Sequence, residues 1–315
     1  MRIPRYPECA PISLDMKASL HPDLSLLPDG ISEYTFAGLY LFRRSYNYHI
    51  AQLDDTHLYL QGEKDGKRFF MLPCGPPDDQ ELLRELTESH DYLKGLAERF
   101  ADKDRLRFEM IGYHLEEDRN NFDYLYLKKD LAELSGRKFH KKRNLVNGFV
   151  NNYSYSEYPI RPDNLNDALD ICDRWRDERE DEGDYPAARE ALERMEELGL
   201  HGYLVAVEGK PAAYTLGEPL QKGRAFAVHF EKAVGGYKGI YQFINQCFAS
   251  VLPRHYHYIN REQDLGDDGL RQAKMTYRPW GFVKKYRGRL WNATELGSET
   301  TNERVDETGI ANIFV

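Results

Sequence analysis

The order hairpin, helix, strand is predicted twice along this chain of 315 residues. Residues 57–72 and 201–216 each alternate apolar and polar side chains on both sides of a turn that contains Gly and Lys, which predicts two β-hairpins. Chance similarity between two common hairpins is the alternative, but the shared order predicts a duplicated α/β unit. A helix and a strand are predicted after each hairpin: residues 79–100 and 106–111 after the first, and, beyond a strand at 226–231, residues 240–248 and 256–260 after the second.

The composition is typical of a soluble globular protein with a substantial core, since 41% of the residues are hydrophobic and 30% are charged. No apolar run reaches the ~18 residues that span a bilayer, and the first residues lack the apolar core of a signal peptide. These features favour a cytoplasmic protein without integral membrane association. Buried free thiols are expected for the four cysteines, which fit no zinc or redox spacing: Cys9, Cys74, Cys172 and Cys247.

Charge is segregated along the chain, although the formal net charge is −9. This net charge argues against a broad nucleic-acid-binding surface, because such a surface has to neutralise phosphates. Residues 128–143 nonetheless carry seven Lys and Arg against two acids, whereas residues 173–197 carry eleven acids against five Arg. A basic helix face is often merely solvated. The candidate tRNA contacts in the basic segment are Lys138, Lys141, Lys142 and Arg143.

The two predicted crossover helices differ at their starts. The second half has Gly235-Gly-Tyr-Lys-Gly239, in which glycines let the backbone approach a ligand and helix-start amides favour anions. The first half has Gly75-Pro-Pro-Asp-Asp79, whose prolines lack an N–H group and whose acids repel phosphate. Many helices begin after a glycine-rich turn, so the motif is weak by itself. It predicts a phosphate-bearing donor in the second half, with the cofactor-binding residues Gly235, Gly236, Tyr237, Lys238 and Gly239.

The strand over residues 225–231 has two different faces. Phe226, Val228 and Phe230 form an apolar face, whereas small residues followed by His229 and Glu231 form the other face and suggest the floor of a cleft. Either ionisable side chain is a candidate general base that accepts a proton from an attacking amine. The alternative is a half-exposed strand with a solvated polar face.

Polar residues also gather where the strand over 256–260 ends. Ligands of open α/β sheets usually bind near the carboxyl ends of strands. The alternative is an ordinary loop in which Asp267 or Asp268 caps the following helix. The candidate substrate-binding residues are Asn260, Arg261, Glu262 and Asp264.

No metal is expected, because His255 and His257 share a strand face without a third ligand at a convincing spacing. The sequence also contains no Gly-x-Ser-x-Gly elbow and no Walker-type loop.

Several blocks of the sequence together resemble the phosphatidylglycerol lysyltransferase C-terminal domain family, long described as a domain of unknown function. The resemblance covers roughly residues 12–290. The blocks that carry it are residues 32–43, 124–144, 229–232, 239–242 and 259–266.

The resemblance implies an α/β (α+β) fold with two tandem GNAT-like acyltransferase domains, whose mixed sheets are flanked by helices. The domains are expected at residues 1–127, without a donor site, and at 128–290, with the donor cleft, before a polar acidic tail over 291–315. The family is also similar to Fem-type aminoacyltransferases, which take an aminoacyl group from charged tRNA. Its lysyltransferases have a membrane-embedded part that is not seen in this sequence.

The resulting hypothesis is an acyl- or aminoacyltransferase that uses acyl-CoA or aminoacyl-tRNA to modify an amine or hydroxyl of a small-molecule, lipid or peptide acceptor. Glu231 or His229 would deprotonate the acceptor, Arg261 and Asp264 would position it, and backbone amides would stabilise the oxyanion. The alternative is a non-catalytic ligand-binding protein that keeps the tandem fold. A third hypothesis is a nucleic-acid-binding module built on the basic segment.

Overall fold

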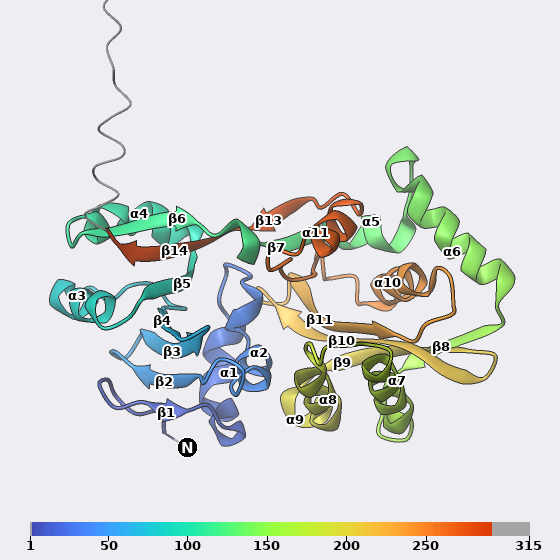
Figure 1. Cartoon of the computed structure of the whole chain (residues 1–315), viewed down its shortest axis with the longest axis horizontal. Helices are drawn as coiled ribbons and strands as arrows, with labels where there is room; N and C mark the ends of the chain where they lie inside the picture. The colour runs from blue at the N-terminus through green and yellow to red at the C-terminus, as the bar shows by residue number, and fades with distance from the viewer. Residues whose placement is uncertain (1, 292–315) are drawn as a thin grey trace, which may run out of the picture.

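The computed structural model describes residues 2–291 as two halves that lie side by side, each built on a seven-stranded mixed sheet (Figure 1). The predicted α/β class with helix-flanked mixed sheets is confirmed. The first sheet has the strand order β1 (Ala10–Pro11), β2 (His49–Gln52), β3 (Leu58–Lys64), β4 (Lys67–Met71), β5 (Tyr92–Ala97), β14 (Lys285–Leu290) and β6 (Tyr113–Glu117). The second has the order β13 (Gly281–Val283), β7 (Asp123–Leu127), β12 (Tyr258–Asn260), β11 (Ala225–Ala233), β10 (Lys210–Leu220), β9 (His201–Val207) and β8 (Tyr155–Pro159).

The two sheets have the same arrangement when the second is followed from β8 to β13. Each contains one parallel pair, β4 with β5 and β11 with β12. Parallel neighbours need a crossover connection, which is α3 (Gln80–Glu88) in the first half and α10 (Ile240–Val251) in the second. This symmetry supports the predicted duplication. The two predicted hairpins are not equivalent, however. The hairpin at 57–72 is β3–β4, whereas the one at 201–216 is β9–β10, which occupies the place of β2–β3.

Each half contributes one strand to the sheet of the other half. β7, which ends the expected first domain, lies between β12 and β13 of the second sheet. β14, which comes from the expected second domain, lies between β5 and β6 of the first sheet. In Figure 1 the red β14 is accordingly found among the strands of the first half. Both sheets therefore contain strands from both expected domain ranges, 1–127 and 128–290, which stay a prediction as separate units. The expected tail, 291–315, lies outside the described residues except for Trp291.

Helices cover the sheets and join the halves. In the second half, α7 and α10 lie on opposite sides of the sheet (Figure 1). An ion pair of 2.8 Å between Arg43 and Glu190 connects α8 to the segment after α2. The remaining helices are α1 (Lys17–Ser25), α2 (Phe36–Leu41), α4 (Glu98–Glu109), α5 (Lys128–Glu133), α6 (His140–Asn152), α7 (Leu165–Asp177), α8 (Tyr185–Glu193), α9 (Met195–Leu198) and α11 (Asp268–Met275). Short 3-10 turns occur at η1 (Leu14–Met16), η2 (Ser32–Tyr34), η3 (Arg119–Asn121) and η4 (Arg137–Phe139).

Two predicted elements of the first half are wrong. The helix predicted over 79–100 is interrupted by β5, which is buried along its whole length, and the strand predicted over 106–111 is largely the end of α4. In a strand, Leu106, Phe108 and Met110 would lie on one face. Instead, Leu106 and Met110 are 72% and 79% exposed, whereas Phe108 is buried. Short apolar runs do not distinguish a helix from a strand, and burial by neighbouring strands decided the outcome.

The expectations for membrane spans and for the cysteines can be compared with the structure. Among residues 2–291, no helix is long and apolar enough to cross a bilayer. The four cysteines are free thiols, as predicted, but only Cys172 and Cys247 are buried; Cys9 and Cys74 are partly exposed.

Candidate functional site

A cavity of about 660 Å³ lies between the two halves. The first half contributes residues of η2 and β5, and the second contributes residues of β11, α10, α11 and the loop that follows β12. Sequence analysis singled out five of its lining residues: Lys142, His229, Glu231, Arg261 and Glu262.

The cavity opens beside β11 because its partner strand ends early. β12 pairs with β11 only from Ala225 to Ala227, whereas β11 continues to Ala233 with β10 on its other side. One edge of β11 beyond Ala227 is therefore free of a neighbouring strand. His229 and Glu231 lie in this part of β11 and line the cavity.

A register shift in β11 directs His229. Leu216 pairs with Phe230 and Gly217 pairs with Val228, so the pairing skips His229. A Cβ atom at Gly217 would lie 1.9 Å from a backbone oxygen of β11, so the strands approach this closely only with glycine there. Such bulges change the direction of a side chain and are common next to functional sites.

His229 lies between two carboxylates. Its Nδ1 is 2.7 Å from Glu262 Oε1, and its Nε2 is 3.0 Å from Glu218 Oε1. Burial lowers the pKa of His229, but hydrogen bonds and charges from both carboxylates outweigh burial and raise the pKa to about 10. At neutral pH the ring is therefore a cation with both nitrogens engaged. This geometry supports a fixed positive charge rather than the general base that the sequence suggested.

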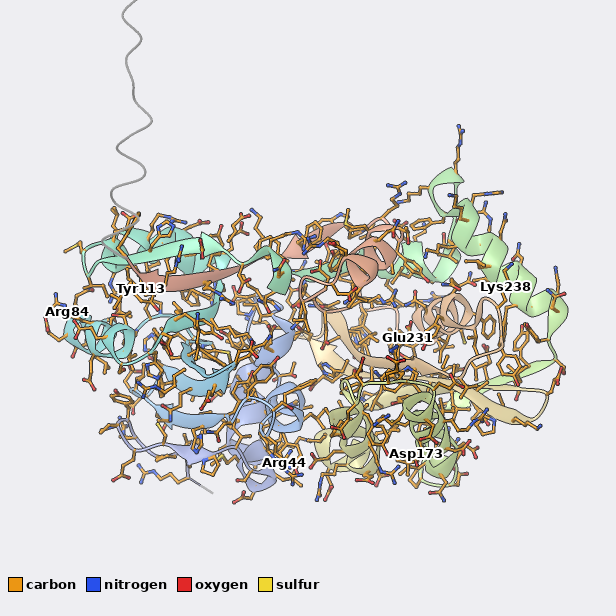
Figure 2. All side chains as sticks on the ribbon, viewed as in Figure 1. Arg44, Arg84, Tyr113, Asp173, Glu231 and Lys238 are labelled. Atoms are coloured by element: carbon orange, nitrogen blue, oxygen red, sulfur yellow. The ribbon has the colours of Figure 1, made fainter. Side chains whose placement is uncertain are left out.

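Glu231 is held in the second half between β11 and α10 (Figure 2). Its Oε1 accepts a hydrogen bond of 3.0 Å from Arg261 Nη2, and its Oε2 accepts one of 3.2 Å from Asn245 Nδ2. Burial lowers the pKa of Arg261, but the Glu231 charge raises it above its ordinary value overall. A carboxylate has about four lone-pair positions, so Glu231 keeps acceptor capacity for a substrate. Its role as general base stays a prediction.

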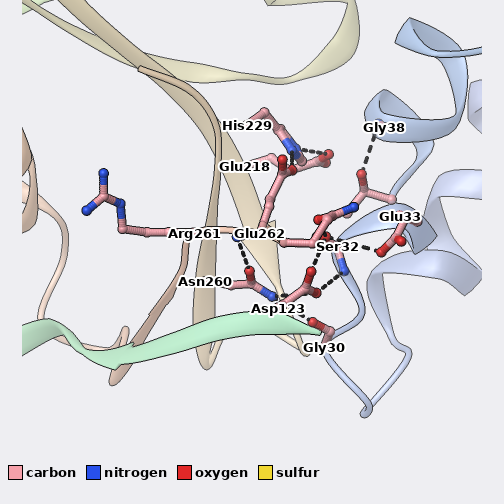
Figure 3. Close-up of polar contacts among 12 residues, drawn as sticks. Gly30, Ser32, Glu33, Gly38, Asp123, Glu218, His229, Asn260, Arg261 and Glu262 are labelled. Carbon is pink, nitrogen blue, oxygen red and sulfur yellow. Dashed lines mark hydrogen bonds and ion pairs between the residues drawn. The ribbon is translucent and has the colours of Figure 1, made fainter. Parts of the chain in front are cut away.

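Asn260 and Asp264 shape the loop after β12 and do not line the cavity. Asn260 is fully buried and donates to Asp123 Oδ2 at 3.0 Å (Figure 3). Asp264 is also fully buried and accepts from Tyr124 Oη at 2.6 Å and from Arg271 Nε at 2.9 Å. These contacts turn the loop so that Arg261 extends away from the His229 cluster in Figure 3. Asp267 caps α11 through Leu270 N, as the alternative interpretation of this segment proposed.

The glycine-rich loop lies away from the cavity. Gly235 N donates to Glu178 Oε2 at 2.9 Å, so a carboxylate already occupies the first amide. A Cβ atom at Gly239 would lie 2.4 Å from Leu145 O, which shows that α6 packs directly on the start of α10. In Figure 2, Lys238 lies at this outer end, beside α6. None of the five predicted donor-loop residues lines the cavity: Gly235, Gly236, Tyr237, Lys238 and Gly239.

The basic segment divides between surface and cavity. Lys142 reaches the cavity, where its Nζ lies 4.0 Å from the centre of the Tyr277 ring. Lys138 forms a 2.6 Å ion pair with Asp130, and Arg143 donates to the carbonyl of Gly136 at 3.1 Å. Lys141 is exposed on α6. The four candidate tRNA contacts thus have different environments.

Sequence analysis missed several cavity lysines. Lys274 donates to the carbonyl of Arg261 at 2.6 Å, and burial followed by the Arg261 charge lowers the pKa of Lys274 to about 8. Nothing in the sequence marks Lys274, because it looks like an ordinary surface residue of an amphipathic helix. Lys94 gave a usable signal, since a lysine in the otherwise apolar strand β5 needs an explanation.

The cavity is basic in an acidic protein. Four carboxylates line it, Glu33, Asp184, Glu231 and Glu262. Opposing them are the His229 cation and six other basic side chains, which are Lys94, Lys142, Arg179, Lys232, Arg261 and Lys274. Charge of this sign suits an anionic substrate or carrier. Within residues 2–291, no three His, Cys, Asp or Glu side chains are grouped as metal ligands.

A buried ionic cluster lies where the halves exchange strands. Lys285 opens β14 and Asp123 opens β7; both are fully buried, and their charged groups are 2.7 Å apart. Glu33 forms a second ion pair with Lys285. Ser32 donates to Asp123 at 2.9 Å (Figure 3). Burial lowers the pKa of Lys285, but Asp123 and Glu33 together raise it above its ordinary value. The cluster fixes η2 and the two exchanged strands beside the cavity.

Comparisons with known proteins agree with this architecture. A protein of unknown function from Bacteroides thetaiotaomicron VPI-5482 is 34% identical, with a TM-score of 0.80, over 90% of this chain and 99% of that chain. L-PGS from Bacillus licheniformis is 15% identical, with a TM-score of 0.59, over 94% and 96% of the two chains. FemX is 8% identical, with a TM-score of 0.53, over 92% and 99%. The last two likenesses concern the fold.

The family model described as "Phosphatidylglycerol lysyltransferase, C-terminal" matches residues 24–288. This range contains both sheets except β1 and the last residues of β14, and it contains every cavity residue named above. The chain therefore belongs to the phosphatidylglycerol lysyltransferase C-terminal family, and its fold is of the aminoacyltransferase type.

Proposed function

We propose that this protein is an aminoacyltransferase that moves an aminoacyl group from aminoacyl-tRNA to an amine or hydroxyl acceptor in the cavity between the halves. The observation that carries the proposal is the Glu231–Arg261 pair, which lies at the free edge of β11 inside a basic cavity. Membership of a family named for lysyl transfer supports the same reaction class.

The chemistry assigns each group a task. The acceptor nitrogen or oxygen attacks the ester carbonyl while its proton passes to Glu231. The carbon–oxygen bond to the carrier then breaks, and the carrier oxygen takes up the proton. Arg261 and Asn245 hold Glu231 in place, and Lys142 and Lys274 supply positive charge for the oxyanion, as preorganised charges do in other acyl transfers.

The surroundings favour tRNA over acyl-CoA as the carrier. α6 carries the exposed Lys141 beside Lys142, which lines the cavity, so positive charge is present both on the surface and at the cavity. A pyrophosphate at Gly235 would instead meet the Glu178 carboxylate. The acceptor, whether a small molecule, a lipid or a peptide, is not specified by these contacts.

The test of the proposal is Glu231→Gln. Loss of the base lowers single-turnover aminoacyl transfer by about 10²-fold or more. Glu157→Gln is the matched control, because this exposed carboxylate lies on β8 outside the cavity. Equal rates for Glu231→Gln and the control, with both proteins folded, would remove Glu231 from the role. Binding of a charged tRNA without turnover by the wild type would favour the non-catalytic alternative.

The carrier is tested separately by replacing Lys138 and Lys141 with Ala. Removal of two phosphate contacts lowers tRNA affinity and reduces the dependence of log Kd on log salt by about two. Lys103→Ala, an exposed lysine on α4 of the first half, is the control and leaves both unchanged. A thermal-shift response to acetyl-CoA, but none to charged tRNA, would contradict the choice of carrier.

A further inference from the structure

A second part of the cavity, at its first-half end, has groups that the proposed transfer chemistry does not use. Lys94 and Glu33 both line the cavity there. The other cavity carboxylates are paired within the wall: Glu231 with Arg261, Glu262 with His229, and Asp184 with Lys232.

The backbone directs Lys94 toward the cavity through a second register shift. β14 pairs Tyr286 with Leu96 and Gly288 with Leu93, so β5 carries one extra residue at Lys94 and Gly95. Gly95 has a φ of +69°, a conformation that glycine adopts without strain. Bulges change side-chain direction next to functional sites, and Lys94, like His229, lies at such a bulge beside the cavity.

Lys94 is 5% exposed, and among residues 2–291 its ammonium forms no ion pair and donates no hydrogen bond. Its ammonium lies 4.8 Å from the centre of the Tyr46 ring and 5.4 Å from that of Phe69. Burial lowers the pKa of Lys94, which the Glu33 charge offsets only in part. The ammonium of Lys94 thus has unused donors at the cavity wall, where a ligand anion can accept hydrogen bonds from them.

Glu33 has an unused hydrogen-bond acceptor that matches the unused donors of Lys94. Its Oε2 pairs with Lys285, whereas its Oε1 is buried and has no hydrogen-bond partner in the described chain. The preceding and following contacts fix its position, since Ser32 is bound to Asp123 and Tyr34 Oη donates to the carbonyl of Gly95 at 2.8 Å. The Tyr34–Gly95 bond joins the residues that follow Glu33 and Lys94, and thereby holds the two charged side chains in one part of the cavity.

We propose that Lys94 and Glu33 form a subsite for an α-amino acid group, in which Lys94 binds the carboxylate and Glu33 Oε1 binds the ammonium. An adjacent unused cation and unused anion match a ligand that carries both charges, and neither a simple amine nor a simple acid satisfies both. If the subsite holds the acceptor, the acceptor is a free or terminal α-amino acid, and this part of the inference rests on the proposed function. As a binding site it stands independently of transfer.

Calorimetric titration with a panel of free α-amino acids tests the subsite. The wild type binds at least one of them, and Lys94→Met weakens that binding about tenfold or more, because a charge-assisted hydrogen bond is lost. The analogue without the carboxylate binds wild type and Lys94→Met equally, and Glu33→Gln weakens this analogue as well as the amino acid. Lys103→Met removes the same charge from the exposed surface of α4, outside the cavity, and changes amino-acid affinity less than twofold.

Two results overturn the subsite. One is the absence of amino-acid binding by folded wild-type protein at millimolar concentration. The other is an equal effect of Lys94→Met on the amino acid and on its decarboxylated analogue, which would show that Lys94 only balances the Glu33 charge. Amino-acid binding without any transfer from charged tRNA would retain the subsite and reject the proposed function, whereas transfer without amino-acid binding would do the reverse.

Discussion

The two halves place a carboxylate near the start of the crossover helix in different ways. In the first half Asp79 caps α3 itself, accepting from the amides of Glu81 and Leu82 at 2.9 and 3.2 Å. In the second half no side chain caps α10, and Glu178, an exposed residue just after α7, binds the amide of Gly235 instead. A cap within the same turn is permanent, whereas a carboxylate from a distant segment can be displaced. Only the Glu178 contact therefore depends on how two distant segments pack together.

The halves also differ at the bulges that face the cavity. β11 presents His229, whose charge is balanced by Glu218 and Glu262 within the wall. β5 presents Lys94, for which no ion pair is found among residues 2–291. The same backbone device thus carries a neutralised charge in one half and an available charge in the other. The two bulges nevertheless lie on strands that the duplication does not match, because β5 corresponds to β12 and not to β11.

The largest expected effect concerns the cluster that joins the halves. Lys285→Met leaves Asp123 and Glu33 buried without their cation and lowers the free energy of unfolding by about 3–5 kcal/mol. Lys284→Met, one residue earlier, removes only exposed pairs with Glu98 and Glu117, and it should lower the free energy of unfolding far less. Denaturant unfolding measures both. Equal losses would show that the exchanged strands do not depend on the buried pair.

An effect of intermediate size concerns the balanced bulge. The pKa of His229 is about 10 in the folded protein and roughly 6.5 when unfolded. Its stabilising contribution is therefore complete below pH ~6.5 and is lost as the pH rises toward 10, at up to about 1.4 kcal/mol per pH unit.

The measurement is the difference in unfolding free energy between wild type and His229→Gln at several pH values. This difference in unfolding free energy should shrink between pH ~7 and ~10. Lys274 has a pKa of about 8 in the folded protein, so its own contribution to stability rises with pH. Both proteins contain Lys274, and its contribution therefore cancels in the difference. A difference that does not change with pH would show that His229 is not held as a cation.

The smallest expected effect compares the two carboxylates near the helix starts. Asp79→Ala removes a true cap and costs ~1 kcal/mol of stability without changing phosphate binding. Glu178→Ala costs about 0.5 kcal/mol or less, but it frees the Gly235 amide and raises affinity for inorganic phosphate or CoA by about two- to fivefold. Thermal unfolding and equilibrium binding assays separate these outcomes. Unchanged binding in Glu178→Ala would leave the glycine-rich loop without a role as a donor site.

Sequence patterns predicted the local features of this protein well. The hairpin at 57–72, the helix from Ile240 and the strand that carries Glu231 all follow from alternation and glycine placement, which depend on near neighbours. The segment 92–111 was not predictable in this way, because its apolar residues suit a helix or a strand. The neighbours of β5, including the distant strand β14, decided between them.

The sequence by itself determined the duplicated α/β order, the segregation of charge and the candidates His229, Glu231 and Arg261. Only the tertiary structure showed that β7 and β14 are exchanged, that Asn260 and Asp264 serve the loop, and that Lys94 and Glu33 share the cavity. The physical reason is range. Periodicity and turn chemistry act over a few residues, whereas the ionisation and partners of a buried charge depend on segments such as η2 and β14, which are far apart in the chain.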